Sequence, residues 1–171
     1  MPFFAVLILI IVGVIGIDQL TKWLIYFNLP INDEIVVIDG LFEITHIRNP
    51  GMAFGLLPDQ RWIFITASII GISAICVYVF KFSKDSRLVK IGFALVVGGG
   101  LGNMVDRIAL GEVIDMIHIT VFNDFFPWVF NIADSCVCVG SGIAIVGFIL
   151  EFIQELRADR AKKQEKSNDN S

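Results

Sequence analysis

Long apolar runs, each broken by very few polar positions, dominate the chain. Four of these runs are long enough to cross a bilayer as a helix, which takes about 20 residues, and they cover about residues 3–27, 62–80, 88–108 and 128–152. The first run has no basic segment before it and no small-residue cleavage site, so we expect a retained span and not a signal peptide. The pattern predicts an all-α membrane protein with four transmembrane helices.

A different pattern occupies the segment between the first two runs. The apolar stretch 35–38 is followed by Asp39-Gly40 and then by the stretch 41–47, and Asp-Gly favours the positive φ angles of a two-residue β-turn. The sequence therefore predicts a small β-hairpin or sheet over about residues 30–57, on the outer membrane surface. Its last part, 53–57, is apolar enough to dip back into the interface.

Composition excludes several other classes of protein. Of the 171 residues, 56% are hydrophobic and 18% are charged, which lies well outside the range of soluble domains and of disordered chains. The 13 Lys and Arg residues form no stripe along a face, so no nucleic-acid partner is expected. At this length we expect one domain over residues 1–157, followed by a polar tail, 158–171, that frays.

The placement of the basic residues predicts the orientation in the membrane. Four of them lie at positions 81–90 and five at positions 157–166, which a four-span protein would bring to the same side. Loops rich in Lys and Arg face the cytoplasm. We therefore expect both termini in the cytoplasm and the hairpin on the opposite, outer face.

The three cysteines, Cys76, Cys136 and Cys138, all lie inside apolar runs. An odd number of thiols within membrane spans does not suggest a disulfide framework, and no His is near enough in sequence to complete a zinc-ligand pattern. We expect buried and inert thiols, as is common for free cysteines.

Polar residues inside the spans are the candidates for chemistry, because a charge near the centre of a bilayer costs about 2.5–3.5 kcal/mol on insertion scales. Asp18 and Lys22 lie one helical turn apart, so Lys22 can pair with Asp18 while it snorkels toward the interface. A structural and a functional ion pair are equally compatible with this spacing. Asn103 and Arg107 are also one turn apart, and the glycine-rich stretch 98–102 before them favours close packing of another helix.

Asp115 and Asp134 form the pair most suited to catalysis. Asp115 follows the third span and Asp134 is expected about two turns into the fourth, so both carboxylates would lie at similar depth near the outer interface. Two nearby carboxylates in a low-dielectric site tend to share one proton, which leaves one as a general base for water and the other as a general acid. Metal-free amide hydrolysis requires this arrangement. Taken alone, the pair is equally compatible with two unrelated interfacial carboxylates.

Two other functions also place polar residues in membrane helices. A small proton-coupled transporter or channel does so, but its polar groups are expected at the midplane and throughout the bilayer thickness, whereas here they cluster toward one side. A structural or assembly subunit would explain the glycine-rich helix faces but not two carboxylates in apolar surroundings.

Five short motifs, taken together, resemble the motif set of the bacterial lipoprotein signal peptidases, also called signal peptidase II. In chain order they are Asp18–Lys22, Asn49–Gly55, Gly99–Arg107, Gly111–Asp115 and Phe130–Ser135. The resemblance runs from the first span to the fourth and excludes only the tail. Met52 stands where a smaller residue is expected, a difference that removes no polar group.

The resemblance implies an aspartic endopeptidase of the bacterial inner membrane that removes the signal peptide of prolipoproteins just before a cysteine carrying diacylglycerol. It implies that Asp115 and Asp134 are the catalytic dyad, and it implies no metal and no organic cofactor. The residues that it implies hold the substrate or support the dyad are Asp18, Lys22, Asn49, Gly51, Asn103, Arg107 and Asn131. The expected partners are the lipid-modified prolipoproteins and membrane lipid, and we expect a monomer.

Overall fold

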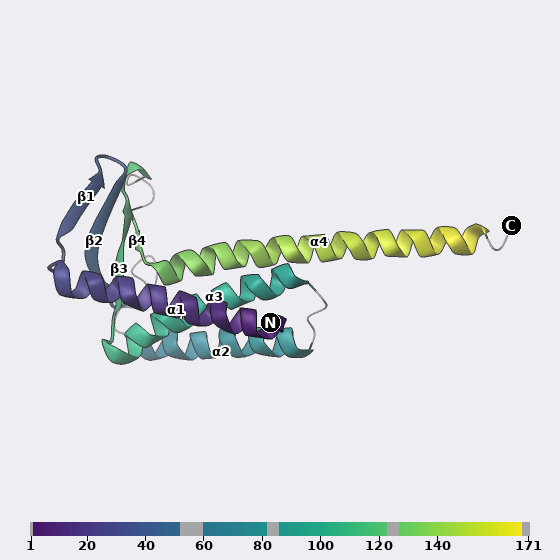
Figure 1. The fold of residues 1–171 in the computed structure, drawn as a ribbon, viewed down its shortest axis with the longest axis horizontal. Helices are drawn as coiled ribbons and strands as arrows, with labels where there is room; N and C mark the ends of the chain where they lie inside the picture. Colours follow the sequence, from purple (N-terminus) through teal and green to yellow (C-terminus); the bar gives the residue numbers. More distant parts are fainter. Residues whose placement is uncertain (1, 52–59, 82–85, 123–126, 169–171) are drawn as a thin grey trace.

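The computed structural model describes residues 2–51, 60–81, 86–122 and 127–168. Its elements, in chain order, are α1 (Phe3–Asn28), β1 (Glu34–Ile38), β2 (Phe42–Asn49), α2 (Arg61–Lys81), α3 (Arg87–Ala109), β3 (Val113–Ile119), η2 (Thr120–Phe122), β4 (Val129–Phe130) and α4 (Ile132–Asn168). The helices run side by side, a small sheet lies across one end of them, and both termini lie at the other end (Figure 1).

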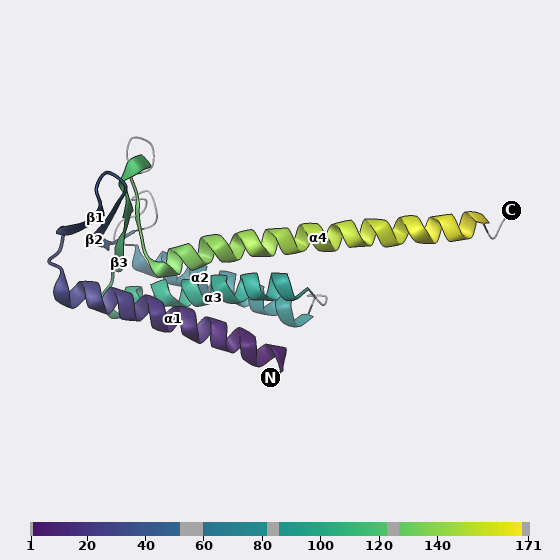
Figure 2. The ribbon, with the colours of Figure 1, turned by 45° about the horizontal axis from the view of Figure 1, so that its top comes forward.

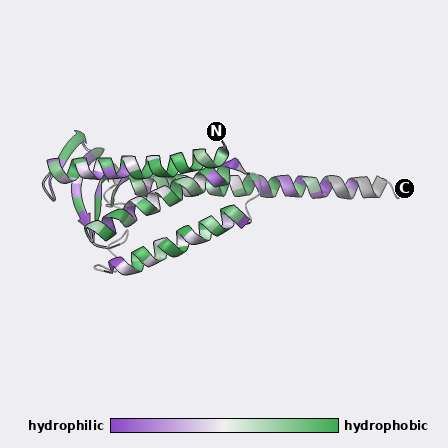
Figure 3. Cartoon of the chain, turned by 60° about the horizontal axis from the view of Figure 1, so that its bottom comes forward, coloured by the Kyte–Doolittle hydropathy of each residue, from purple (hydrophilic) through white to green (hydrophobic). Residues whose placement is uncertain are grey.

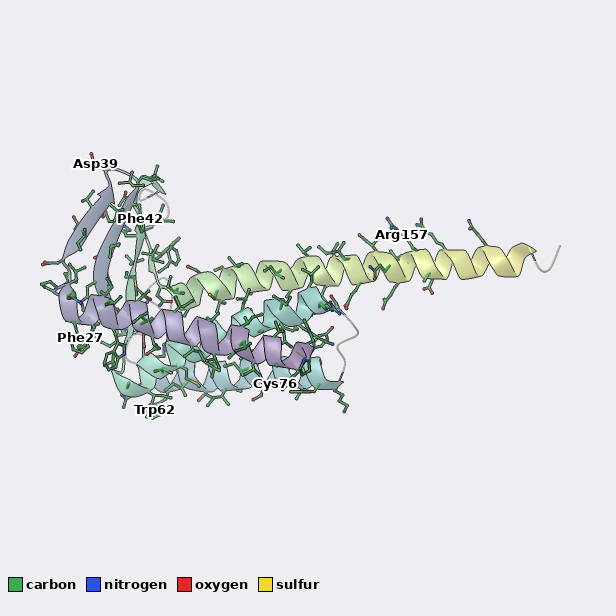
Figure 4. All side chains as sticks on the ribbon, in the orientation of Figure 1. Phe27, Asp39, Phe42, Trp62, Cys76 and Arg157 are labelled. Carbon is green, nitrogen blue, oxygen red and sulfur yellow. The ribbon has the colours of Figure 1, made fainter. Side chains whose placement is uncertain are left out.

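Four helices in the described part of the chain are long and apolar enough to span a membrane. Their outward surfaces are hydrophobic over most of their length, whereas polar residues gather near the sheet and along the C-terminal part of α4 (Figure 3). Phe27 and Trp62 mark the ends of α1 and α2 next to the sheet (Figure 4), and both are exposed. The predicted multi-span helical membrane protein is confirmed.

α3 is the central helix and packs against each of the other three. α1 diverges from α4 toward its N-terminus (Figure 2). The glycine-rich stretch of α3 permits the close approach that the sequence predicts. A Cβ atom on Gly98 would lie 2.9 Å from the Cβ of Val14 in α1, and one on Gly99 would collide with the backbone oxygen of Ala133 in α4. Larger side chains at these positions would push α1 and α4 away from α3.

The sheet has the strand order β1-β2-β3-β4, and every neighbouring pair is antiparallel. β1 and β2 form the predicted hairpin, with Gly40 at a φ of 67° in its turn. Asp39 lies at the tip of this hairpin, away from the helices (Figure 4). The sheet is larger than the hairpin because residues 113–119 and 129–130, where the sequence predicted no strand, add β3 and β4.

The two ends of α4 differ from the expectation. α4 begins at Ile132, not near Trp128, because Val129 and Phe130 pair with β3 and so cannot join the helix. At the other end α4 continues to Asn168 through the segment that was expected to fray. No Gly or Pro interrupts residues 148–168, and Glu, Lys, Arg, Ala and Gln, which are common there, are good helix formers. Arg157 lies on the part of α4 that extends beyond the other helices (Figure 4).

Candidate active site

A cavity of about 530 Å³ lies at the sheet end of the helices. Residues of β2, α3, β3 and α4 line it, and they include both Asp115 and Asp134. Its other walls are largely apolar, with Val113, Trp128 and Val137 among them. The fold therefore brings the two carboxylates predicted as a pair into one partly apolar space.

Asp115 lies on β3, opposite Ile47 of β2. Two side-chain amides hold its carboxylate: Asn49 Nδ2 donates to Oδ2 at 2.9 Å and Asn131 Nδ2 donates to Oδ1 at 2.7 Å. Burial raises the pKa of Asp115 to about 7, and the nearby Asp134 carboxylate also raises it, whereas the hydrogen bonds from the two asparagines oppose these effects. Asp115 can therefore carry or release a proton near neutral pH.

Asp134 lies in the first turn of α4, not two turns into it as expected, because the helix starts four residues later than the apolar run. Asn131 and Asp134 cap this helix reciprocally: Asn131 Oδ1 accepts from the backbone N–H of Asp134 at 2.8 Å, and Asp134 Oδ2 accepts from the backbone N–H of Asn131 at 3.2 Å. This arrangement is an Asn/Asp version of the capping box. Asn103 Nδ2 donates to the other oxygen, Oδ1, at 2.7 Å.

Asn131 connects the two carboxylates. Its side chain is fully buried, its Nδ2 donates to Asp115, and its backbone N–H donates to Asp134. The same Nδ2 lies 3.0 Å from the Oδ1 of Asn103. A single residue thus fixes the orientation of both carboxylates and of the asparagine beside them.

Arg107 and Gly51 organise the turn that follows β2. Arg107 Nη2 donates to the backbone oxygen of Gly51 at 3.1 Å, and the guanidinium lies 5.1 Å from the ring centre of Phe64 in α2. Asn49 Oδ1 accepts from the backbone N–H of Gly51 at 3.0 Å. Because Asn49 also binds Asp115, these contacts hold one wall of the cavity in place. Arg107, Asn49 and Asn103 all line the cavity, and Gly51 is bound to Asn49 and Arg107 through its backbone N–H and oxygen.

Asp18 and Lys22 lie next to this site, in the interior of the helix bundle. They form an ion pair at 2.8 Å, and neither side chain is exposed. The expectation that Lys22 snorkels toward the interface is wrong, because its ammonium is held inside by Asp18, by Asp106 at 2.9 Å and by Asn103 Oδ1 at 2.8 Å. Asp18 Oδ1 accepts from the backbone N–H of Ala133 at 2.9 Å, so α1 also caps the start of α4.

Asp106 and Gln19 belong to this network, although the sequence alone predicted no role for either residue. Asp106 is 3% exposed; besides Lys22, it binds Gln19 Nε2 at 2.8 Å and the backbone N–H of Ile114 at 3.3 Å. A carboxylate inside an apolar span is itself a signal of a polar partner. Lys22, the partner of Asp106, lies 84 residues away in sequence, so the pairing could not be recognised from the sequence.

The cysteines differ from the expectation of buried thiols. Cys76 and Cys138 are exposed, and Cys136 is intermediate. Their apolar runs face the surroundings of the helix bundle more than its interior, which is the usual consequence of a membrane environment. Cys138 lies one helical turn after Asp134 and lines the cavity. The predicted interfacial segment 53–57 lies outside the described residues.

The arrangement has the parts needed for proton transfer at a polar bond. Two carboxylates line one cavity, amide N–H groups hold all four of their oxygens, and one of the two has a pKa near neutrality. A general base and a general acid work best when their pKa values lie near the operating pH. Apolar walls reduce the local dielectric and strengthen these interactions.

Comparison with known proteins gives consistent matches over most of the chain. A family model described as signal peptidase (SPase) II matches residues 10–150. A solved structure, described as a bacterial membrane enzyme determined by the in meso method at 2.3 Å resolution, is 34% identical, with a TM-score of 0.80 over 86% of this chain and 90% of that chain. A second with the same description, at 1.9 Å resolution, is 35% identical, with a TM-score of 0.77 over 84% and 92%.

These matches, together with the helices and the cavity, define a multi-pass membrane peptidase. The chain belongs to the signal peptidase II family, the lipoprotein signal peptidases. The motif resemblance seen in the sequence is thereby confirmed at the level of the family.

Proposed function

We propose that the protein is an aspartic endopeptidase that cuts the signal peptide from prolipoproteins immediately before the diacylglyceryl-modified cysteine. The observation that carries this proposal is the joint placement of Asp115 and Asp134 in one cavity, with amide donors on all four carboxylate oxygens. Two carboxylates that share one proton can serve as base and acid in the same step.

The reaction follows from this shared proton. The ionised carboxylate takes a proton from water, and the water oxygen attacks the carbon of the scissile carbonyl to form a tetrahedral intermediate. The protonated carboxyl then gives its proton to the peptide nitrogen, the carbon–nitrogen bond breaks, and the amine of the lipidated cysteine leaves. The proton taken from water is then on the carboxylate that acted as base, and its transfer to the other carboxylate after the products depart restores the starting state. Arg107 and Asn49 line the cavity and offer N–H donors to the substrate backbone.

The position of the cavity suits a substrate that stays in the bilayer. It lies at the sheet end of the spans, near the helix ends marked by Phe27 and Trp62 (Figure 4). Aromatic residues of this kind favour the membrane interface. A prolipoprotein anchored by two acyl chains and an apolar helix presents its scissile bond near that interface, where the dyad can reach it.

We place this end on the periplasmic face of the bacterial inner membrane, with both termini in the cytoplasm. The basic residues at 81–90 and 157–166 support this orientation. Single-cysteine variants at Asp39 and at Arg157, made in a chain without its native cysteines, test it in intact spheroplasts with a membrane-impermeant thiol reagent. Labelling at position 39 with protection at 157 is expected, and the reverse pattern would overturn the orientation.

Cleavage by the purified protein tests the proposed activity. Protein in detergent micelles is incubated with a synthetic prolipoprotein peptide that carries a diacylglyceryl cysteine, and the products are identified by mass spectrometry. We expect one cut, before the modified cysteine, and far slower cutting of the same peptide without lipid. Absence of any cut by folded protein would favour the transporter or channel, which proton-flux measurements in liposomes would then detect.

A further inference from the structure

Lys22 occupies an unusual place for a cation in a membrane helix. Its ammonium has three N–H donors, and three acceptors surround it: Asp18 Oδ2 at 2.8 Å, Asp106 Oδ2 at 2.9 Å and Asn103 Oδ1 at 2.8 Å. The side chain is fully buried. Two of the acceptors are carboxylates, and the third is the side-chain amide of Asn103, which also binds Asp134.

The contact with Lys22, together with one from Asn131, fixes which way the amide of Asn103 points. Asn103 Oδ1 receives N–H groups from Lys22 and from Asn131 Nδ2, neither of which can accept a hydrogen bond. A flipped amide would direct its NH₂ group at the ammonium and leave both donors unpaired in a buried site, which is costly. The NH₂ group of Asn103 therefore faces Asp134 Oδ1, at 2.7 Å.

Asp134 thereby receives donors that favour its ionised form. Asn103 donates to one oxygen and the backbone N–H of Asn131 to the other. The carboxylate also lies in the first turn of α4, where the helix dipole stabilises negative charge. Asp115, in contrast, lies on a strand and is 3% exposed, and the donors to its carboxylate are the side-chain amides of Asn49 and Asn131.

We propose that Lys22 is a positioning residue which, through the amide of Asn103, makes Asp134 the ionised member of the dyad and leaves the shared proton on Asp115. This inference rests on the proposed function. Asp134 is then the base that takes the proton from water, and Asp115 is the acid that gives its proton to the leaving nitrogen. Lys22 is not among the residues that line the cavity, and its hydrogen-bonded connection to Asp134 runs through Asn103.

Asp106 completes the arrangement from the other side. One of its oxygens, Oδ2, binds both Lys22 and the backbone N–H of Ile114, the residue just before Asp115. Its other oxygen, Oδ1, is held by Gln19 of α1. The carboxylate of Asp106 thus holds both the ammonium of Lys22, which orients Asn103 toward Asp134, and strand β3, which carries Asp115.

Two variants test the inference by enzyme kinetics. Lys22→Met removes the ammonium and keeps the length of the side chain. Asn103→Asp keeps the acceptor for Lys22, and so the buried pairing, but replaces the N–H that faces Asp134 with an oxygen. For both we expect kcat to fall by about 10- to 100-fold, below the full effect of losing an acid or base, with KM nearly unchanged. The acidic limb of the kcat profile should move to higher pH by on the order of one unit, because Asp134 ionises less readily.

Lys90→Met is the matched control, since it removes a lysine from α3 at the end of the bundle away from the sheet. Its pH profile should equal that of the unmodified protein. If Lys22→Met lowers only the yield of folded protein, and Asn103→Asp keeps the normal pH profile, Lys22 is merely structural and the inference is wrong.

A measurement without turnover separates this inference from the proposed function. Infrared difference spectra near pH 6 detect the band of a protonated carboxyl group. We expect Asp115→Asn to remove that band and Asp134→Asn to keep it. The opposite pattern would overturn the assignment even if cleavage occurs as proposed, and absence of cleavage with the expected spectra would overturn the proposed function alone.

Discussion

Asn131 and Asp134 cap α4 with each other's backbone N–H groups, at 2.8 and 3.2 Å. The motif that starts the last membrane helix is therefore also the motif that fixes one carboxylate of the dyad. Asn131 reaches the second carboxylate as well, through Nδ2 and Asp115 at 2.7 Å. Helix capping and the geometry of the proposed active site are the same set of contacts.

Two substitutions of Asn131 should separate these roles. Serine can still cap the helix but has no NH₂ group for Asp115, whereas alanine can do neither. We expect both variants to lose most cleavage activity, and Asn131→Ala to lower the free energy of unfolding by about 1 kcal/mol more than Asn131→Ser. Denaturation in detergent, followed by circular dichroism, gives this difference. Equal stability of the two variants would show that the cap contributes little.

Asp18→Asn should affect stability more than turnover. Asp18 is fully buried, pairs with Lys22 and caps Ala133, so its neutralisation should cost on the order of 3 kcal/mol. Asp106 still holds Lys22, and the dyad keeps its donors. We expect a lower unfolding temperature with kcat per folded molecule reduced less than about tenfold. Asp39→Asn, at the exposed hairpin tip, is the control. A stable Asp18→Asn protein without activity would instead place Asp18 in the reaction.

Activity should fall as pH rises through neutrality. The proposed acid, Asp115, has a pKa raised to about 7 by burial, so above this pH it loses the proton that the leaving nitrogen needs. We expect kcat/KM to decrease about tenfold per pH unit well above the pKa. Activity that keeps rising well above pH 7 would contradict the role of Asp115 as acid.

The raised pKa of Asp115 also makes the free energy of unfolding depend on pH. The ordinary value is 3.8 and the folded value is about 7, so the folded state binds this proton more tightly than the unfolded state. The contribution of Asp115 to the free energy of unfolding is therefore fully present below pH 4 and decreases as pH rises toward 7.

Cys138 offers a chemical probe of the cavity. Its thiol lines the cavity one turn from Asp134, but no acid–base role falls to it. We expect Cys138→Ala to cleave normally, and a bulky membrane-permeant thiol reagent to inactivate the unmodified protein but not this variant. Cys76→Ala, on the far part of α2 (Figure 4), should remain sensitive to the reagent. Loss of activity in Cys138→Ala itself would indicate a thiol mechanism.

The sequence was sufficient for the spans, the hairpin and the family, because long apolar runs and short motifs are local signals. It was not sufficient for the contacts that make the site. The start of α4 was misplaced because Val129 and Phe130 look like helix in an apolar run, and only pairing with β3 makes them a strand. The burial of Lys22 could not be predicted either, because it depends on Asp106, which lies near the C-terminal end of α3 and is 84 residues away in sequence.

Replacing each carboxylate of the dyad in turn tests the central claim most directly. Asp115→Asn and Asp134→Asn keep the size of the side chain and one of its two oxygen acceptors but can no longer exchange the proton. Cleavage of the lipidated peptide by purified, folded variants should fall by at least about 10²–10⁴-fold in each case, and the double variant should be hardly worse than either, because the two groups act as one unit. A well-folded Asp134→Asn protein that cleaves the lipidated peptide at a near-normal rate would contradict the account.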